Sequence, residues 1–346
     1  MGNPCDAPSK ALVRNLGKSE KFYSFNDDKD PDTLTDHFFQ HTHEGLTSFV
    51  IFYTLACRYG RCLGCNLPSL QSSKPVGLRS LIRQMDTLFE KYYTPDIRSK
   101  LYQIIVSNNG SVLDEVTFPS TALVYLVAQA NLHLPGLRLL TLETRVEYVD
   151  MIELEFLSRA LKEGEVATDL EIAVGFEAFD EHIRNKYFRK SLTKKSFKKM
   201  VLRLAHYGFR LKCYFMLKPV PGLTDEEAVA DVISAVHYLS SLADYYGISI
   251  NIHLNPTFVA RGTPLETAFK QGDYTPPHLA DVLEVVKAGR GKNLTIFVGL
   301  NDEGLAVPGG SFRRPGDESL IALLDEFNRT QNYDSLRVKE YGGTYP

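Results

Sequence analysis

The sequence has no apolar run of membrane-spanning length, no surplus of either charge and few cysteines. The longest apolar segments among its 346 residues are only as long as a β-strand. The 39 Lys and Arg residues are offset by 42 Asp and Glu residues, and the net charge of −3 gives no general argument for nucleic-acid binding. The first residues do not combine a charged segment with an apolar one, as a secretory signal peptide does. We therefore expect a cytoplasmic protein that does not associate with membranes.

The five cysteines are unevenly distributed along the chain. Cys57, Cys62 and Cys65 lie close together, directly after the apolar run 49–56, whereas Cys5 and Cys213 stand alone. Cysteines cluster in cytoplasmic proteins mainly where they bind metal or do chemistry. Three thiolates on one loop can bind three irons of a [4Fe–4S] cluster and leave the fourth iron open to an outside ligand. A zinc site completed by a histidine or Cys213, or a disulfide in an exported protein, remains an alternative, and Cys213 by itself is expected to be a small core residue.

From Phe49 onward, strand-like and helix-like segments alternate, which predicts parallel βα units. Six strands followed by a trailing one fit an open barrel better than a closed one of eight. The predicted fold is α/β, a partial (β/α)6 TIM-like barrel at 48–300, with an irregular N-terminal arm at 1–47 and a C-terminal extension at 301–346. The expected strands are 49–56, 101–107, 137–142, 170–176, 210–217, 249–254 and 294–298. The expected helices are 78–93, 121–130, 151–161, 194–207, 225–246, 277–288 and 320–329.

The three-cysteine loop after a first buried strand resembles that of the radical S-adenosylmethionine (SAM) superfamily. The usual spacing there is Cys-x3-Cys-x2-Cys, whereas this chain has one more residue between the first two cysteines and has Gly64 where an aromatic residue is usual. The resemblance implies that SAM chelates the open iron of a [4Fe–4S] cluster. An electron, supplied by a donor of flavodoxin or ferredoxin type, would then cleave SAM to a 5′-deoxyadenosyl radical that abstracts hydrogen from the substrate.

Residues that follow the strands are the candidate SAM ligands, because chemistry in such barrels takes place at the carboxyl ends of the strands. Asn108, Asn109, Gly110 and Ser111 follow the second strand as a small polar turn. Such a turn lets backbone groups approach a ligand closely, which suits the SAM amino group, and a plain turn is the alternative. Glu177 ends the fourth strand, where a carboxylate can accept hydrogen bonds from ribose hydroxyls.

Glu143, Lys218 and Asn255 end the third, fifth and sixth strands. Glu143 and the nearby Arg145 are expected either to form a structural salt bridge or to contact the substrate. Lys218 would bind the SAM carboxylate or an anionic substrate. Asn255, together with His253, would recognise adenine or substrate, and a histidine that is simply satisfied at a strand end is an equal alternative.

Two further groups of residues allow more than one interpretation. The segment 184–199 holds the densest positive charge of the chain, interleaved with aromatic residues. Such a surface can bind RNA phosphates and stack bases, but a solvated helix face explains the same pattern. His37, His41 and His43 lie close together in the N-terminal arm, where solvated or capping histidines are more common than a metal site.

Four runs in the second half of the chain give a closer resemblance. At 175–177, 216–219, 255–263 and 272–277, and more generally over 48–300, the chain is similar to the radical SAM subunit family of archaeosine biosynthesis. That resemblance implies a radical carbon–nitrogen lyase that cleaves a lysine adduct on a 7-deazaguanine base of tRNA, and it allows for a partner subunit. The C-terminal part departs from the family, because residues 307–316 and a final helix replace the expected short cysteine-containing tail. A small-molecule or peptide substrate is therefore the alternative, and a non-catalytic zinc or iron–sulfur protein is the second one.

Overall fold

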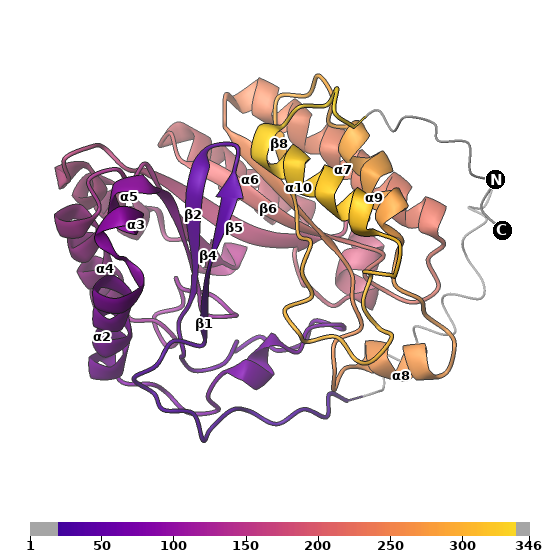
Figure 1. The fold of residues 1–346 in the computed structure, drawn as a ribbon, viewed down its shortest axis with the longest axis horizontal. Helices are drawn as coiled ribbons and strands as arrows, with labels where there is room; N and C mark the ends of the chain where they lie inside the picture. The colour runs from indigo at the N-terminus through magenta and orange to yellow at the C-terminus, as the bar shows by residue number, and fades with distance from the viewer. Residues whose placement is uncertain (1–19, 337–346) are drawn as a thin grey trace.

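The fold is built on one curled β-sheet (Figure 1). The computed structural model describes residues 20–336, and within them eight strands are hydrogen-bonded in sequence order. The first two form an antiparallel hairpin, and every later pair of neighbours is parallel. The strands are β1 (Asp36–Thr42), β2 (Gly45–Ile51), β3 (Leu101–Ser107), β4 (Leu139–Thr144), β5 (Asp169–Glu177), β6 (Arg210–Leu217), β7 (Ile250–Pro256) and β8 (Thr295–Val298).

Helices cover the outer face of the sheet, α2 to α5 on one half and α7, α9 and α10 on the other (Figure 1). They are α2 (Leu78–Thr87), α3 (Pro95–Lys100), α4 (Ser120–His133), α5 (Met151–Ala160), α6 (Lys194–His206), α7 (Asp225–Tyr246), α8 (Pro264–Lys270), α9 (Leu279–Lys287) and α10 (Glu318–Thr330). Short 3-10 or π turns are η1 (Leu67–Leu70), η2 (Leu88–Tyr92), η3 (Val146–Tyr148), η4 (Leu161–Glu163) and η5 (Ile183–Tyr187). Among the described residues, every helix is too short or too polar to cross a bilayer.

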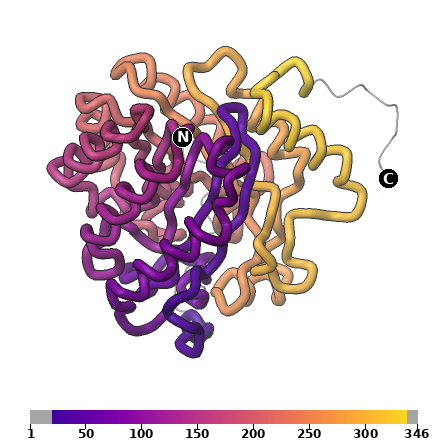
Figure 2. The backbone as a smooth tube through the Cα atoms, turned by 60° about the vertical axis from the view of Figure 1, so that its left-hand side comes forward, coloured from indigo at the N-terminus to yellow at the C-terminus, as the bar shows by residue number. Residues whose placement is uncertain are grey.

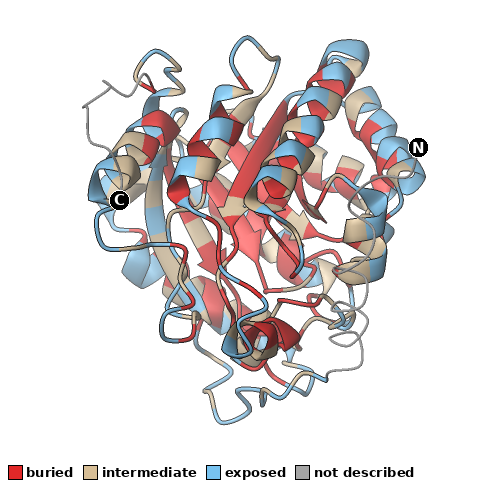
Figure 3. Cartoon of the chain, turned by 90° about the vertical axis from the view of Figure 1, so that its right-hand side faces the viewer, coloured by how far each residue is buried: buried red, intermediate tan, exposed pale blue. Residues whose placement is uncertain are grey.

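The core lies between the sheet and these helices, with buried residues concentrated in the strands and on the inner faces of the helices (Figure 3). The strands are rich in Val, Ile and Leu because parallel strands are covered on both faces. The longest helix, α7, starts at a capping box in which Thr224 and Glu227 satisfy each other's backbone N–H groups, and it ends at Gly247 with φ 64°. Local signals therefore set the ends of α7, and packing sets its buried face.

Helix α10 protects the open side of the barrel. It packs on β8 and also contacts β1, and Figure 2 shows this yellow helix beside the indigo hairpin. The Asn328 amide pairs with the backbone N–H and C=O of Val298 at 2.8 and 2.9 Å, and Gln331 does the same for Ile296 at 3.0 and 2.7 Å. These side chains occupy hydrogen-bonding groups that would otherwise form an exposed sheet edge.

The sequence predicts most of this arrangement. The α/β partial barrel is confirmed, with β2 to β8 as its six strands and the trailing one. The expectation of an irregular segment before residue 48 is wrong, because β1 and the start of β2 lie there. Strand β1 is largely polar or half-exposed and lacks the buried apolar run that identifies the other strands. The helices α3 and α8 were not predicted, since each has only one or two turns. The division of the chain at 47 and 300 stays a prediction.

The described part of the N-terminal arm runs beneath the loops at the carboxyl ends of the strands (Figure 1). Phe22 N donates to Gly262 O at 3.0 Å, and Asn26 N donates to Gln71 O at 3.0 Å. The Asp27 carboxylate accepts hydrogen bonds from the backbone and hydroxyl of Ser73, both at 2.7 Å. The arm is thus fastened to two loops of the mouth of the barrel.

Candidate active site

A cavity of about 290 Å³ opens at the carboxyl ends of the strands. Alternate residues of β2, β5, β6 and β7 face it, as the two-residue period of a β-strand requires. These residues are Phe49 and Ile51, Ala173 and Gly175, Tyr214 and Met216, and His253 and Asn255. The wall also includes Ser107 of β3, Glu143 of β4, Arg145 after β4 and Gly299 after β8.

Cys57, Cys62 and Cys65 all line this cavity, and none of them forms a disulfide within the part of the chain that the structure describes. Burial raises the pKa of the Cys62 thiol and raises that of Cys65 to about 12. Without an electropositive ligand Cys62 and Cys65 therefore stay protonated, and a metal that binds them must displace their protons. Cys213 is fully buried in β6 away from this loop, as expected for a core residue, and Cys5 lies outside the described residues.

The cysteine loop is held by the loops that follow several strands. Arg58 forms a 2.9 Å ion pair with Asp114, which follows β3. Leu63 N donates to Phe188 O at 2.9 Å in the loop after β5. The Asn66 amide donates to Arg261 O at 3.2 Å after β7. Contacts on three sides fix the loop before any ligand binds, as a preorganised metal site requires.

The turn after β3 packs directly against Cys57. A Cβ at Gly110 would lie 3.2 Å from both Cα and Cβ of Cys57, so only glycine permits this approach without a shift. Asn109 has φ 56°, and its side-chain Nδ2 is buried without a hydrogen-bond partner among residues 20–336. Buried amide groups are almost always paired, so this donor indicates an acceptor supplied by a ligand.

Glu177 forms a 2.7 Å ion pair with Lys190 on the cavity wall. Glu177 has φ 70°, and a Cβ at Gly175 would overlap both the carboxylate and the ammonium. The glycine therefore makes room for the pair. Both side chains are largely buried, with 12% and 13% of their surface exposed.

The predicted Glu143–Arg145 salt bridge is not the observed arrangement. Arg145 instead bonds Glu147 at 2.5 Å and donates to Lys190 O at 3.0 Å, and its guanidinium lies 3.8 Å from the ring centroid of Tyr59. Glu143 accepts a short hydrogen bond from the Tyr214 hydroxyl, and burial raises the pKa of its carboxyl. Glu143 and Arg145 both line the cavity, so both remain available to a ligand.

Asn255 and His253 come from β7 and face the same space. Gly299 lies against them, because a Cβ there would lie 3.3 Å from His253 Nε2 and would overlap Asn255 Oδ1. Burial lowers the pKa of His253 to about 3, so the imidazole is neutral at physiological pH. Glu303, from the loop after β8, completes this side, where withdrawal from water and the nearby Glu143 charge raise its pKa to about 7.

Three of the predicted SAM ligands do not line the cavity, namely Asn108, Ser111 and Lys218. Lys218 has φ 60° and turns away to form a 2.7 Å ion pair with Asp225. The Asn108 amide donates to Ser111 O at 3.4 Å and to Thr117 at 3.1 Å, which stabilises the turn from within. The other five, Asn109, Gly110, Glu143, Glu177 and Asn255, lie together on the cavity wall.

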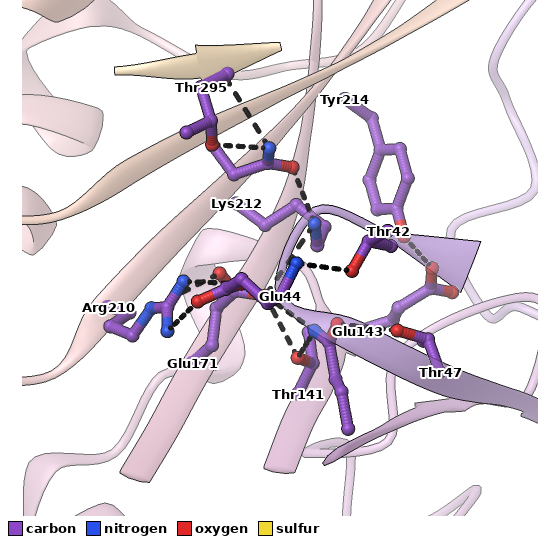
Figure 4. Close-up of polar contacts among 12 residues, drawn as sticks. Thr42, Glu44, Thr47, Thr141, Glu143, Glu171, Arg210, Lys212, Tyr214 and Thr295 are labelled. Atoms are coloured by element: carbon purple, nitrogen blue, oxygen red, sulfur yellow. Dashed lines mark hydrogen bonds and ion pairs between the residues drawn. The ribbon is translucent and has the colours of Figure 1, made fainter. Parts of the chain in front are cut away.

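Below the cavity, at the amino-terminal ends of the strands, a network of polar side chains fills the barrel (Figure 4). Glu171 accepts a 2.9 Å hydrogen bond from Thr141 and lies 3.7 Å from the Lys212 ammonium. Lys212 donates to Asn251 at 2.5 Å, and Arg210 forms two hydrogen bonds with Glu44 at 2.8 and 2.9 Å. Apart from Arg210 Nε, which has no hydrogen-bond partner among residues 20–336 and lies 4.0 Å from the Glu171 carboxylate, these groups satisfy one another, so this layer is structural.

Sequence reasoning missed Tyr214, Met216, Lys190 and Glu303 as wall residues. The two-residue period of β6 could have revealed Tyr214 and Met216, because they share a face with Lys212. Lys190 and Glu303 lie in loops, for which no periodic signal exists. The histidines of the arm do not reach the cavity, and His37 instead lies 3.0 Å from the Ser48 hydroxyl on the hairpin.

The residues present fit a cluster and SAM. Three thiols, the soft ligands that iron–sulfur clusters use, share one cavity with an unpaired amide donor and a glycine that keeps the wall close. No group of three or more His, Cys, Asp or Glu side chains within 20–336 is arranged to hold a single metal ion.

No protein-family model matches the chain. The chain is 26% identical over 248 residues to archaeosine synthase subunit beta of Methanosarcina acetivorans, which covers 70% of this chain and 67% of that protein. An uncharacterised protein of Methanocaldococcus jannaschii is 25% identical over 312 residues, 88% of this chain and 82% of that protein. The archaeal Elp3 of Methanocaldococcus infernus shares the fold, with a TM-score of 0.51 and 16% identity, over 73% of this chain and 59% of that structure.

The fold shared with Elp3 agrees with the predicted partial barrel. The sequence similarity to an archaeosine synthase beta subunit recurs with the protein of that name from Thermococcus kodakarensis, at 23% identity over 250 residues. Together with the three-cysteine cavity, it confirms the resemblance first given by the motifs, which is a similarity to radical SAM enzymes and, among them, to the archaeosine synthase beta subunits.

Proposed function

We propose that Cys57, Cys62 and Cys65 bind a [4Fe–4S] cluster, that SAM occupies the rest of the cavity, and that the enzyme modifies a tRNA base. The observation that carries the proposal is the meeting of three unbridged thiols and the unpaired Asn109 amide in one cavity. The bound cluster would supply the electron that cleaves SAM to the hydrogen-abstracting radical. A donor of flavodoxin or ferredoxin type would reduce it.

The chain's own residues would orient SAM. Asn109 Nδ2 is a donor and therefore suits a carboxylate oxygen, while Gly110 leaves backbone groups accessible. Glu177, held by Lys190, would accept hydrogen bonds from ribose hydroxyls, and Asn255 would contact adenine. Asn108, Ser111 and Lys218 would support these walls from behind.

Anaerobic reconstitution followed by reduction with SAM tests the cofactor proposal. The wild-type protein should bind about four irons with labile sulfide and release 5′-deoxyadenosine. Cys57→Ala should lose both properties, while Cys213→Ala, which removes a thiol outside the cavity, should retain them. Retention of iron and product by Cys57→Ala, or a zinc-containing wild type without iron, would contradict the proposal.

The tRNA proposal rests on α6, which has 13 residues and no acid among them. Lys195, Lys198, Lys199 and Arg203 are exposed on it, and no ion pair is found for any of them among residues 20–336. Other helices neutralise exposed cations, as in the 2.5 Å Arg159–Glu155 pair of α5. Unpaired cations on one face favour a polyanion as partner.

A groove of about 460 Å³ runs between this face and η3. Lys199 and Arg203 line it, together with the hydroxyls of Ser191 and Ser196. Its position is close to the cavity, because Ser191 adjoins Lys190 and η3 adjoins Arg145, both of which line the cavity wall. An RNA backbone lying in the groove would therefore bring a nearby base to the cavity. Cleavage of a carbon–nitrogen bond on that base is the reaction that the similarity to archaeosine synthase beta subunits favours.

Filter binding of bulk tRNA at several salt concentrations tests this surface. The triple variant Lys195→Glu, Lys198→Glu, Lys199→Glu should bind tRNA more weakly and reduce the salt slope by about two to three. A control triple with the same charge change, Lys74→Glu, Lys91→Glu, Lys162→Glu, should bind like wild type. Equal binding by both triples would favour a small-molecule or peptide substrate.

The word "subunit" in the relatives' name supports a second polypeptide as partner. We propose that the complete enzyme includes such a subunit, with this chain as the radical component. Co-purification of this chain at its native expression level, followed by mass determination of the intact complex, tests the proposal. A monomer of 39.0 kDa that modifies tRNA alone would contradict it.

A further inference from the structure

Lys21 belongs to the segment of the arm that packs beside the cysteine loop. Phe22 N donates to Gly262 O at 3.0 Å, and a Cβ at Gly262 would lie 2.9 Å from Tyr23 Cβ. The preceding Arg261 accepts the hydrogen bond from Asn66, the neighbour of Cys65. The arm, this turn and the cysteine loop thus form one packed unit with Lys21 at the edge of the metal-binding loop.

The Lys21 ammonium is buried and has no hydrogen-bond partner among residues 20–336. The Tyr23 ring, with its centroid 5.6 Å away, lies near the limit of a cation–π contact. The ammonium is therefore buried in the segment that packs beside the cysteine loop, with no counter-charge of its own among residues 20–336.

Comparable lysines elsewhere in the barrel are paired. Lys190 bonds Glu177 at 2.7 Å, Lys218 bonds Asp225 at 2.7 Å and Lys212 bonds Asn251 at 2.5 Å. Burying an ammonium without a partner costs several kcal/mol, so such groups are paired or bind a ligand. Lys21 is the exception among these four, which indicates that its partner is a bound anion.

We propose that Lys21 is an anion-binding residue of this site, and that its ammonium neutralises a negatively charged group bound beside Cys65. The inference rests on the proposed function and adds to it a role for the N-terminal arm. Two bound groups have the required chemistry. One is the thiolate-ligated cluster, which carries net negative charge, and the other is the carboxylate of SAM.

The experiment compares Lys21→Met, Lys21→Arg and the control Lys74→Met, which removes an exposed lysine elsewhere on the surface. Each protein is reconstituted anaerobically, and three properties are measured: iron content, cluster reduction potential by EPR-monitored titration, and the SAM dissociation constant. Failure of the wild type to bind iron would overturn the proposed function itself. The remaining outcomes concern Lys21 alone.

If the SAM carboxylate is the anion, Lys21→Met should weaken SAM binding about tenfold or more and leave the potential unchanged, because a charged hydrogen bond is lost. If the cluster is the anion, the potential should become more negative, because loss of a nearby positive charge disfavours the added electron. Lys21→Arg should restore either property, and it should also restore iron uptake if Lys21→Met loses it. A Lys21→Met protein that matches Lys74→Met in all three properties, or a loss that arginine does not restore, would overturn the proposal.

Discussion

The two ends of this barrel use polar side chains in opposite ways. At the amino-terminal end, Lys212 forms an ion pair with Glu171 and a hydrogen bond with Asn251, so the three side chains form one network (Figure 4). At the carboxyl-terminal end, the Asn109 amide has no partner within the described residues, and three thiols face a cavity. The first set comes from inward-facing positions of β5, β6 and β7, whereas the second comes from the loops that follow β2 and β3.

This difference separates the residues that stabilise the barrel from the residues that are available to bind a ligand. A polar network that satisfies itself can stabilise the barrel without any ligand, whereas an unsatisfied set is costly until something binds. Substitutions at the amino-terminal end should therefore change stability and leave SAM binding alone. Substitutions at the carboxyl-terminal end should do the reverse.

Glu171→Gln should produce the largest loss of stability, about 3 kcal/mol in the free energy of unfolding. The substitution removes the only carboxylate within 4.0 Å of both Lys212 and Arg210, as far as the described residues show. Urea unfolding measures the effect, and Glu163→Gln, at an exposed position, is the control. A change in SAM affinity per folded molecule would break the comparison.

Gly175→Ala should cost about 2 kcal/mol, because the new methyl group overlaps the Glu177–Lys190 pair and forces it apart. This position belongs to the carboxyl-terminal end, yet its pair is self-satisfied, so the variant tests whether pairing or location decides the outcome. Gly77→Ala, where a Cβ meets nothing within 4 Å, is the matched control. Equal unfolding free energies for the two variants would show that the pair tolerates displacement.

Asn109→Gly should keep the free energy of unfolding within about 1 kcal/mol of wild type. It removes a buried unpaired donor at φ 56°, which offsets the added freedom of glycine in the unfolded chain. SAM affinity should nevertheless fall about tenfold, measured by equilibrium binding to the reconstituted enzyme. Unaltered SAM affinity would remove Asn109 from the ligand set.

Glu303→Gln should have the smallest effect, on the pH dependence of the melting temperature. Burial and the Glu143 charge raise the Glu303 pKa from its ordinary 4.5 to about 7, so the folded state holds this proton more tightly than the unfolded state. Its contribution to stability is therefore lost as the pH rises from about 4.5 to about 7, and the loss is small because the residue as a whole is exposed to solvent. The wild type should lose more melting temperature than the variant between pH 5 and pH 8, and parallel curves would contradict this.

Whether the position of a residue could be predicted from the sequence depended on the kind of segment in which it lies. Strands β3 and β6 and helix α7 have the predicted bounds, because hydrophobic period and capping residues define them locally. Lys218 shares the inward face of β6 by period, but its left-handed backbone turns it to Asp225. Lys21 and Lys190 reach the site only through packing of loops distant in sequence, so no local pattern identified them.

The sequence by itself determined the parallel barrel and the three-thiol loop, because strand period and cysteine spacing are local properties of the chain. Only the tertiary structure decided which polar groups are satisfied. Asp225 of helix α7 neutralises the buried charge of Lys218, whereas Lys21 has no such partner among residues 20–336 and is left available to a ligand. Whether a buried charge meets a partner depends on how the whole barrel closes.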